Sequence, residues 1–315
     1  MRPPRSGLVA AAFTPMHADG SLAPERVGPM VDHLVGQQVA SVFVCGTTGE
    51  GPSLAVAERE TLAEAFVEAA AGRLPVIVHV GHNSLAEARR LAAHAQRIGA
   101  DAISAVAPSY FKPNSAEALV RSLAEITAAA PELPFYYYHI PSMTGVSVDL
   151  FELVDRAAGE LPTMAGLKYT ASTLDELVAL LALQGSRPFD VFFGRDEMLL
   201  AALAVGAQGA IGSTYNFAGR LYRRLIDAFA RGDLEEARRC QARSVAMIRT
   251  ILGLKVQGSG FRTPHSPLAA QKAVMALVGA DCGPVRLPLL PLGPTETAAL
   301  ESELRSIGFF DWACE

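Results

Sequence analysis

Short runs of apolar residues alternate along the chain with longer amphipathic stretches. The short runs are continuously apolar, which is typical of parallel strands that are covered on both faces. The stretches between them carry apolar residues at helical spacing. This alternation predicts eight strand–helix units in succession. The expected strands are residues 8–15, 41–46, 75–81, 102–108, 134–141, 163–170, 189–194 and 209–214.

Residues typical of helix boundaries flank several of the amphipathic stretches. The helix expected over 84–100 begins with Ser84 as its N-cap, has a glutamate three residues later, and ends at Gly99. A helix that also begins with a serine, Ser115, is expected over 115–130, and a third helix is expected over 172–185.

Eight uninterrupted units favour a closed (β/α)8 barrel, the TIM barrel of the α/β class, over a doubly wound sheet. We expect residues 1–232 to form the barrel. Residues 233–315 continue with helical patterns, which we interpret as a C-terminal helical extension packed on the barrel within a single structural unit. The extension includes a loop rich in glycine and proline over 257–267. The active site of such a barrel lies at the carboxyl ends of its strands.

The composition excludes several classes of protein. Half of the residues are hydrophobic and 19% are charged, which excludes a disordered chain. The formal net charge of −5 argues against the basic surface of a nucleic-acid-binding protein. The charge-free stretch 198–219 contains too many polar residues and glycines for a membrane span, and the apolar run near the N-terminus is too short for a signal peptide. The four cysteines form no C-x-x-C pair, so we expect a cytoplasmic protein without a zinc site.

Lysine is scarce in this chain: the 27 basic residues include only Lys112, Lys168, Lys255 and Lys272. Lys168 interrupts the strand expected over 163–170, where an unpaired ammonium is costly. Burial favours the neutral amine, which can attack a ketone, whereas arginine keeps its proton. Lys168 is therefore the candidate Schiff-base nucleophile, although a rim lysine that extends to solvent would have the same spacing. We interpret the other three lysines as surface residues.

A Schiff-base lysine needs a partner for proton transfer. Tyr138, near the end of the neighbouring strand, is the candidate, whereas Tyr136 and Tyr137 are interpreted as core residues. The second strand leads into Thr47 and Thr48, flanked by glycines, and such a turn can direct several donors at one carboxylate. An ordinary turn between a strand and a helix fits the same residues.

The ends of the seventh and eighth strands carry side chains suited to a polyhydroxylated substrate. Gly194, Asp196 and Glu197 follow the seventh strand, and Ser213 lies at the end of the eighth. Alternatively, Asp196 and Glu197 only occupy the first turn of a helix, where the macrodipole favours acidic side chains.

Two other classes of protein are open at this point. His79 and His82 form an H-x-x-H pair at the end of the third strand, a weak indication of a metal site because no third ligand lies nearby. A non-catalytic barrel that binds pyruvate or a sugar acid would share the fold, but would need neither a buried amine nor a phenol.

Five motifs occur in an order and spacing that together are specific: GTTGEG, YYYHIPSMTGV, GLKYT, GRDE and IGSTYN. With them, the chain resembles the N-acetylneuraminate lyase / dihydrodipicolinate synthase family of class I aldolases, from Gly7 to the C-terminal helices. Within this family the motifs are most similar to the lyases, in particular those of animal type. The synthases place an arginine for their substrate's carboxylate where this chain has Met143, which argues against that branch.

The resemblance implies a role for each of the candidate residues. Lys168 would form the Schiff base with a 2-keto acid, and Tyr138 would take the proton of the C4 hydroxyl as the C3–C4 bond breaks. Thr47 and Thr48 would bind the carboxylate, with Thr48 also touching the Tyr138 hydroxyl, and Tyr110 would reach the site of a neighbouring subunit. The hydroxylated tail of the substrate would lie against Thr170, Gly194, Asp196, Glu197 and Ser213.

The activity that the resemblance implies is the reversible cleavage of N-acetylneuraminate to pyruvate and N-acetylmannosamine by a homotetramer without metal or organic cofactor. We expect no nucleic-acid or membrane partner. The alternatives are an aldolase for another 2-keto-3-deoxy sugar acid and, less in keeping with Met143, a synthase-like condensation. Arg195 departs from the uncharged residue of the lyases, and the loop 257–267 is longer than its counterpart. Both departures bear on the identity of the sugar acid.

Overall fold

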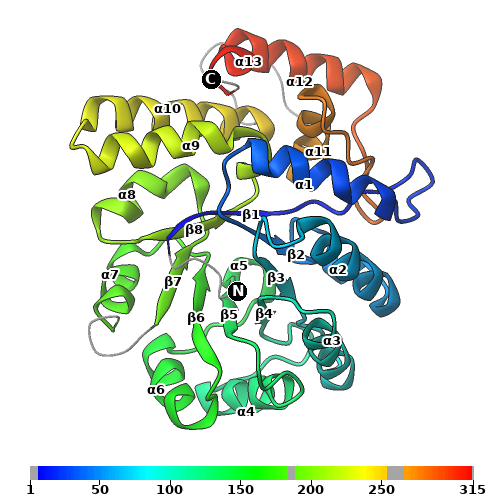
Figure 1. Ribbon diagram of the computed structural model, residues 1–315. Coiled ribbons are helices and arrows are strands. Elements are labelled where there is room, and N and C mark those ends of the chain that lie inside the picture. Colours follow the sequence, from blue (N-terminus) through cyan, green and yellow to red (C-terminus); the bar gives the residue numbers. More distant parts are fainter. Residues whose placement is uncertain (1–5, 184–188, 254–265, 314–315) are drawn as a thin grey trace.

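Eight parallel strands close into a barrel in sequence order, each hydrogen-bonded to its two neighbours (Figure 1). The computed structural model describes residues 6–183, 189–253 and 266–313. Each predicted apolar run contains one strand, so the predicted (β/α)8 architecture is confirmed and the doubly wound alternative is wrong. The strands are β1 (Gly7–Ala11), β2 (Ser41–Val44), β3 (Val76–His79), β4 (Ala102–Val106), β5 (Phe135–His139), β6 (Met164–Tyr169), β7 (Asp190–Phe193) and β8 (Gly209–Gly212).

Helices surround the barrel and connect successive strands (Figure 1). The predicted caps are present: the Ser84 hydroxyl accepts a hydrogen bond from the third residue of α3, and Ser115 does the same for α4. The helix predicted over 172–185 is present as α7, and residues 184–188 lie outside the described residues. The helices are α1 (Val27–Gly36), α2 (Val56–Ala70), α3 (Leu85–Arg97), α4 (Ala116–Thr127), α5 (Pro141–Thr144), α6 (Leu150–Glu160), α7 (Leu174–Ala182), α8 (Leu199–Ala204) and α9 (Tyr215–Ala230).

Further helices follow the barrel and gather on one side of it, with α10 running along α9 (Figure 1). The charge-free stretch 198–219 is divided among α8, β8 and the start of α9. Within the described ranges, we find no helix whose length and hydropathy would suit a membrane span. The C-terminal helices are α10 (Leu234–Ile251), α11 (Pro267–Leu277), α12 (Pro294–Ser306) and α13 (Phe309–Trp312).

The strands bury both of their faces, which explains their continuously apolar sequences. Successive side chains of a strand point to opposite faces. One set fills the barrel interior and includes Phe43, Tyr138 and Phe192. The other set, which includes Tyr137, packs against the surrounding helices. This alternation directs Tyr138 into the barrel and Tyr137 away from it.

Candidate active site

Lys168 lies in the barrel interior next to Tyr138. The two residues are paired in the register of β5 and β6, and their side chains are only 4% and 3% exposed. The Lys168 Nζ lies 4.0 Å from the centroid of the Tyr138 ring and 4.5 Å from that of Phe43. A rim lysine that extends to solvent is therefore the wrong interpretation. An amine and a phenol thus share a buried, aromatic environment, and desolvation in such a pocket is one way in which a lysine amine is activated as a nucleophile.

The ring of His79 lies edge to face with that of Tyr138, with centroids 6.1 Å apart. Its Nε2 accepts a hydrogen bond from the Val106 N–H at 3.2 Å, and Arg59 donates to its carbonyl oxygen at 2.6 Å. Burial lowers the pKa of His79 well below its usual range, and the Arg59 charge lowers it further. The His79 ring is therefore in its neutral form where it packs against the Tyr138 ring.

The H-x-x-H pair is accounted for by contacts within the chain. His82 Nδ1 accepts a hydrogen bond from the Ser84 N–H at 2.9 Å, at the start of α3. The His79 Nε2 is hydrogen-bonded to the backbone of β4. Across the described residues, no three histidine, cysteine, aspartate or glutamate side chains are grouped as a metal site would need. The pair is therefore better explained by local structure than by a metal.

Thr47 and Thr48 lie in the turn after β2, at the mouth of the barrel. Together with Ser213, from the end of β8, they line a cavity of about 430 Å³. Met143 also lines it. The structure thus brings together three predicted substrate-binding residues from two strands. The C-terminal extension supplies another part of the wall, formed by Ser266, Pro267, Leu268, Gln271, Pro288 and Leu289.

The loop 257–267 was expected to influence this pocket. Only its last two residues, Ser266 and Pro267, are described, and both line the cavity. Residues 254–265 lie outside the described residues.

Gly194 and Thr170 are in contact across the ends of β7 and β6. The Gly194 N–H donates to the carbonyl oxygen of Tyr169 at 2.8 Å. A Cβ at position 194 would clash with the Thr170 side chain, so a larger residue would fit only if Thr170 moved. The Thr170 Oγ1 is buried and has no hydrogen-bond partner among the described residues. A buried hydroxyl without a partner calls for an explanation, and a bound ligand or water is one that would satisfy it.

Asp196 begins a short 3-10 helix, η4 (Asp196–Met198), and its carboxylate is buried against β8. The carboxylate Oδ2 accepts hydrogen bonds from the N–H and the hydroxyl of Thr214, at 2.9 and 2.6 Å. The Thr214 Oγ1 also lies 2.7 Å from the Tyr222 hydroxyl. Burial raises the pKa of Asp196 to about 6, although the Thr214 hydrogen bonds act in the opposite direction. Sequence reasoning missed Thr214, whose one signal was its hydroxyl beside Ser213 in the IGSTYN motif.

Asp196 is expected to make the stability of the protein depend on pH. Because its pKa is raised in the folded state, from 3.8 to about 6, the associated stability is complete below about pH 4 and is lost as the pH rises through about 6. The loss amounts to at most roughly 3 kcal/mol. Asp196→Asn should remove this part of the pH dependence, measured by urea unfolding between pH 4 and 7. Parallel profiles for the variant and the wild type would contradict the assignment.

Arg195 and Glu197 form an ion pair at the same strand end. The Arg195 Nη2 lies 2.6 Å from the Glu197 Oε1, and the two side chains are 37% and 30% exposed. A substrate that approaches Glu197 therefore meets a carboxylate already paired with a guanidinium. The arginine that departs from the lyases at position 195 therefore pairs with a carboxylate that was predicted to bind the substrate.

Tyr110 is exposed, unlike the other predicted site residues, which are buried or half-buried. It lies on the loop between β4 and α4 with its side chain 80% exposed, and its ring is edge to face with that of Phe111. Asn83 accepts a hydrogen bond from its backbone N–H at 3.2 Å. It is not among the described residues that line the cavity.

The interpretation of Lys272 as a surface residue is wrong. Its side chain is 2% exposed, and its Nζ lies 2.8 Å from the buried Glu50 Oε1. Lys112 is exposed, as predicted. Lys255 lies outside the described residues. Sequence reasoning missed Lys272 because a helical pattern does not reveal which distant segment its buried face contacts.

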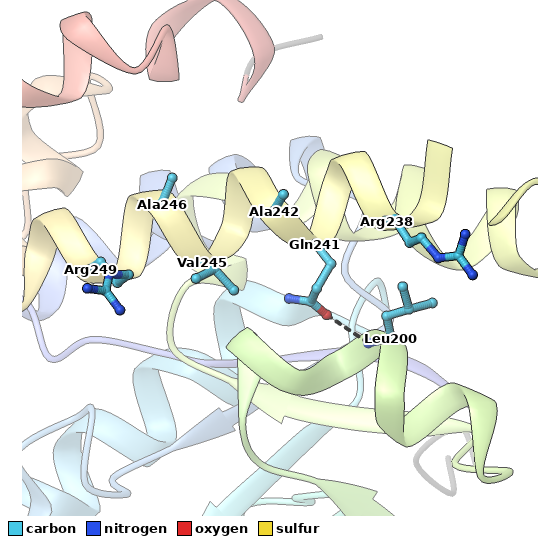
Figure 2. A pocket seen from close by; sticks show the side chains of 7 residues that line it. All are labelled: Leu200, Arg238, Gln241, Ala242, Val245, Ala246 and Arg249. Carbon is cyan, nitrogen blue, oxygen red and sulfur yellow. Dashed lines mark hydrogen bonds between the residues drawn. The ribbon is translucent and has the colours of Figure 1, made fainter. Parts of the chain in front are cut away.

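A second hollow, of about 410 Å³, lies on α10 and α8. Figure 2 shows the Gln241 side chain in it, with its Oε1 accepting a hydrogen bond from the Leu200 N–H at 2.8 Å. The lining offers no carboxylate, thiol or hydroxyl for catalysis, so we assign it no chemistry. It consists of Leu200, Arg238, Gln241, Ala242, Val245, Ala246 and Arg249.

Comparison with known proteins gives matches along almost the entire chain. The model of the Dihydrodipicolinate synthetase family matches residues 4–307. N-acetylneuraminate lyase of Mus musculus is 43% identical over 306 residues, which cover 96% of this chain and 92% of the mouse protein. The solved structure of Proteus mirabilis N-acetylneuraminate lyase is 36% identical, with a TM-score of 0.90, and the match covers 96% of this chain and 99% of that one.

A Ruminococcus gnavus sialic acid aldolase, solved as a catalytic lysine mutant, has the same fold with a TM-score of 0.88 at 28% identity, covering 98% of both chains. Sequence and fold therefore lead to one conclusion: the chain belongs to the dihydrodipicolinate synthetase family.

Proposed function

We propose that this chain is a class I aldolase that reversibly cleaves N-acetylneuraminate to pyruvate and N-acetylmannosamine. The observation that carries the proposal is the Lys168 amine, buried in the barrel with its Nζ 4.0 Å from the centre of the Tyr138 ring. The relatives from Mus musculus and Danio rerio, at 43% and 40% identity, are N-acetylneuraminate lyases.

The proposed reaction begins when the Lys168 Nζ attacks the C2 carbonyl carbon of the open-chain sugar acid. Loss of water leaves a protonated imine, which can accept an electron pair. The C4 hydroxyl then gives its proton to Tyr138, assisted by the substrate carboxylate, and the C3–C4 bond breaks. Its electron pair forms an enamine, while C4 becomes the aldehyde of N-acetylmannosamine. Protonation of C3 and hydrolysis of the imine release pyruvate and restore the free amine.

The remaining strand ends would hold the substrate on either side of the bond that breaks. Thr47 and Thr48 offer hydroxyls to the carboxylate from the wall of the cavity. We place the hydroxylated tail against the opposite strand ends, where the buried Thr170 Oγ1 has no hydrogen-bond partner within the described part of the chain. The other residues proposed for the tail are Gly194, Asp196, Glu197 and Ser213.

We further propose that the enzyme is a cytoplasmic homotetramer in which Tyr110 completes the site of a neighbouring copy. The exposure of the aromatic pair Tyr110 and Phe111 supports a covered position in an assembly. The three described cysteines are free and buried, in keeping with a reducing compartment. The reaction requires no metal or organic cofactor, because the imine on Lys168 itself accepts the electron pair.

A second candidate is an aldolase for another 2-keto-3-deoxy sugar acid. The observation that favours it is the Arg195–Glu197 ion pair, which places a guanidinium beside the proposed tail site. The chemistry at Lys168 would be unchanged.

Pyruvate release from a panel of 2-keto-3-deoxy sugar acids distinguishes the two candidates. We expect the highest kcat/KM for N-acetylneuraminate, because the Thr170 and Ser213 hydroxyls offer hydrogen bonds to a long hydroxylated tail. The Lys168→Ala protein serves as the blank. A higher kcat/KM for a shorter acid without an N-acetyl group would establish the second candidate, and no release from any member would contradict both.

A further inference from the structure

The turn that carries Thr47 and Thr48 has an unusual backbone for its sequence. Cys45 and Glu50, one on each side, have φ values of 59° and 54°, in the left-handed region that non-glycine residues seldom occupy. Such conformations persist where surrounding contacts impose them. Within the turn, the Glu50 N–H donates to the Thr47 carbonyl oxygen at 3.1 Å. The contacts that impose this conformation therefore also set the positions of Thr47 and Thr48.

The Glu50 side chain connects this turn to the C-terminal extension. Its Oε1 lies 2.8 Å from the Lys272 Nζ on α11, and both side chains are buried. Its Oε2 accepts a hydrogen bond from the backbone N–H of Arg286 at 2.8 Å. Both oxygens of one carboxylate are thus held by residues that follow the barrel in sequence.

The surroundings of Lys272 fit an ammonium better than a guanidinium. Besides the Glu50 carboxylate, its Nζ donates to the carbonyl oxygens of Thr14 at 2.9 Å and Pro284 at 2.7 Å. Three oxygens therefore lie within 2.9 Å of one nitrogen, two of them as hydrogen-bond acceptors and the Glu50 Oε1 as an ion-pair partner. An ammonium can face all three from one atom, whereas the donors of arginine are spread over a planar fork. This explains why one of the chain's four lysines occurs here.

Arg286 adds a second connection at the far end of the turn. Its guanidinium donates to both carboxylate oxygens of Glu58, at 2.7 and 2.8 Å, and to the carbonyl oxygen of Ser53 at 3.1 Å. Ser53 lies in η2 (Gly51–Ser53), the 3-10 helix that follows the turn directly. The extension therefore holds the segment after the turn as well as Glu50.

We propose that Lys272 is a positioning residue for substrate binding: through its ion pair with Glu50, α11 holds the Thr47–Thr48 turn in the conformation that binds the carboxylate of the keto acid. Lys272 touches no reacting atom and acts through Glu50. The inference rests on the proposed function, because the carboxylate is that of pyruvate or of the sugar acid.

The test uses the pair of substitutions Glu50→Gln and Lys272→Met in one full-length chain. Lys272→Met alone would leave Glu50 buried and unpaired, which is strongly destabilising, whereas removing both charges is often tolerated. Borohydride trapping of Lys168 is measured as a function of pyruvate concentration. We expect the half-saturating pyruvate concentration to rise about ten-fold, the effect of losing one charge-assisted contact, with the same extent of trapping at saturation. Arg121→Met, which removes an exposed cation that pairs with Glu117 on the same helix, is the matched control.

A folded double variant with an unchanged half-saturating concentration would overturn the proposal. If the double variant does not fold, Lys272→Arg is used instead. Arginine keeps the charge but cannot present three donors from one nitrogen. The same ten-fold rise in the half-saturating pyruvate concentration is expected for it. Hydrogen exchange of the peptide spanning residues 46–53 gives a readout that is independent of activity, and unchanged exchange would also overturn the proposal. Absence of trapping in the wild type would instead contradict the proposed function, and hydrogen exchange would then decide the role of Lys272.

Discussion

Replacing Lys168 by alanine is expected to abolish pyruvate release, with a loss of kcat on the order of 10⁴-fold or more, as for other enzymes that lose their nucleophile. The buried Nζ beside Tyr138 is the nucleophile that we propose, and an alanine leaves the keto acid nothing with which to form the imine. The measurement is pyruvate released from N-acetylneuraminate by the purified variant, with its fold checked by circular dichroism.

The imine on Lys168 can also be detected directly. Borohydride added to the wild type with pyruvate should reduce the imine and leave a stable adduct, found by mass spectrometry on the peptide that contains Lys168. Lys112→Ala is the matched control, because this lysine is exposed and should change neither trapping nor turnover. An adduct on another lysine would contradict the role of Lys168, and the absence of any adduct would contradict the class I mechanism.

Tyr138→Phe should separate imine formation from carbon–carbon cleavage. The phenylalanine keeps the aromatic contacts with Phe43 and His79 but removes the oxygen that receives the C4 proton. Loss of a general acid–base group typically costs about 10²–10⁴-fold in rate. We therefore expect a fall of this size in cleavage of N-acetylneuraminate, with borohydride trapping of pyruvate on Lys168 still present.

Tyr137, next to Tyr138 in the chain, supplies the control for Tyr138→Phe. Tyr137 lies on the same strand, but its side chain belongs to the outer core between the barrel and the helices. Tyr137→Phe removes an identical hydroxyl on the other face of β5, so it should leave turnover close to that of the wild type. Near-normal turnover in Tyr138→Phe would show that another group accepts the proton.

The sequence predicted the pairing of Lys168 with Tyr138 because strand periodicity is a local property. A continuous apolar run indicates burial on both faces, and a single lysine within it must then lie in the interior or at the rim. The order of the strands placed the tyrosine on the adjacent strand, and the barrel closes in that order. The motifs contributed what periodicity could not, namely the roles of Thr47, Thr48 and the tail-binding residues, which remain predictions.

The sequence was less informative where a side chain depends on a distant segment. Asp196 lies in the first helical turn after β7, as the sequence suggested, yet its carboxylate is hydrogen-bonded to Thr214, just after the end of β8. Arg195 was recognised as a departure, but its ion pair with Glu197 depends on the course of the chain at the strand end.

The sequence by itself determined the barrel, the order of its strands and the buried lysine, because apolar periodicity and the alternation of strand and helix are written into short stretches of chain. The tertiary structure alone decided that Lys272 is buried, that Glu50 is its partner, and that the C-terminal extension forms part of the cavity wall. The physical reason is that these contacts join residues from opposite ends of the chain, and no local pattern records which surfaces meet. A helix presents a buried face whether it covers an apolar core or neutralises a buried carboxylate, and only the folded chain distinguishes the two.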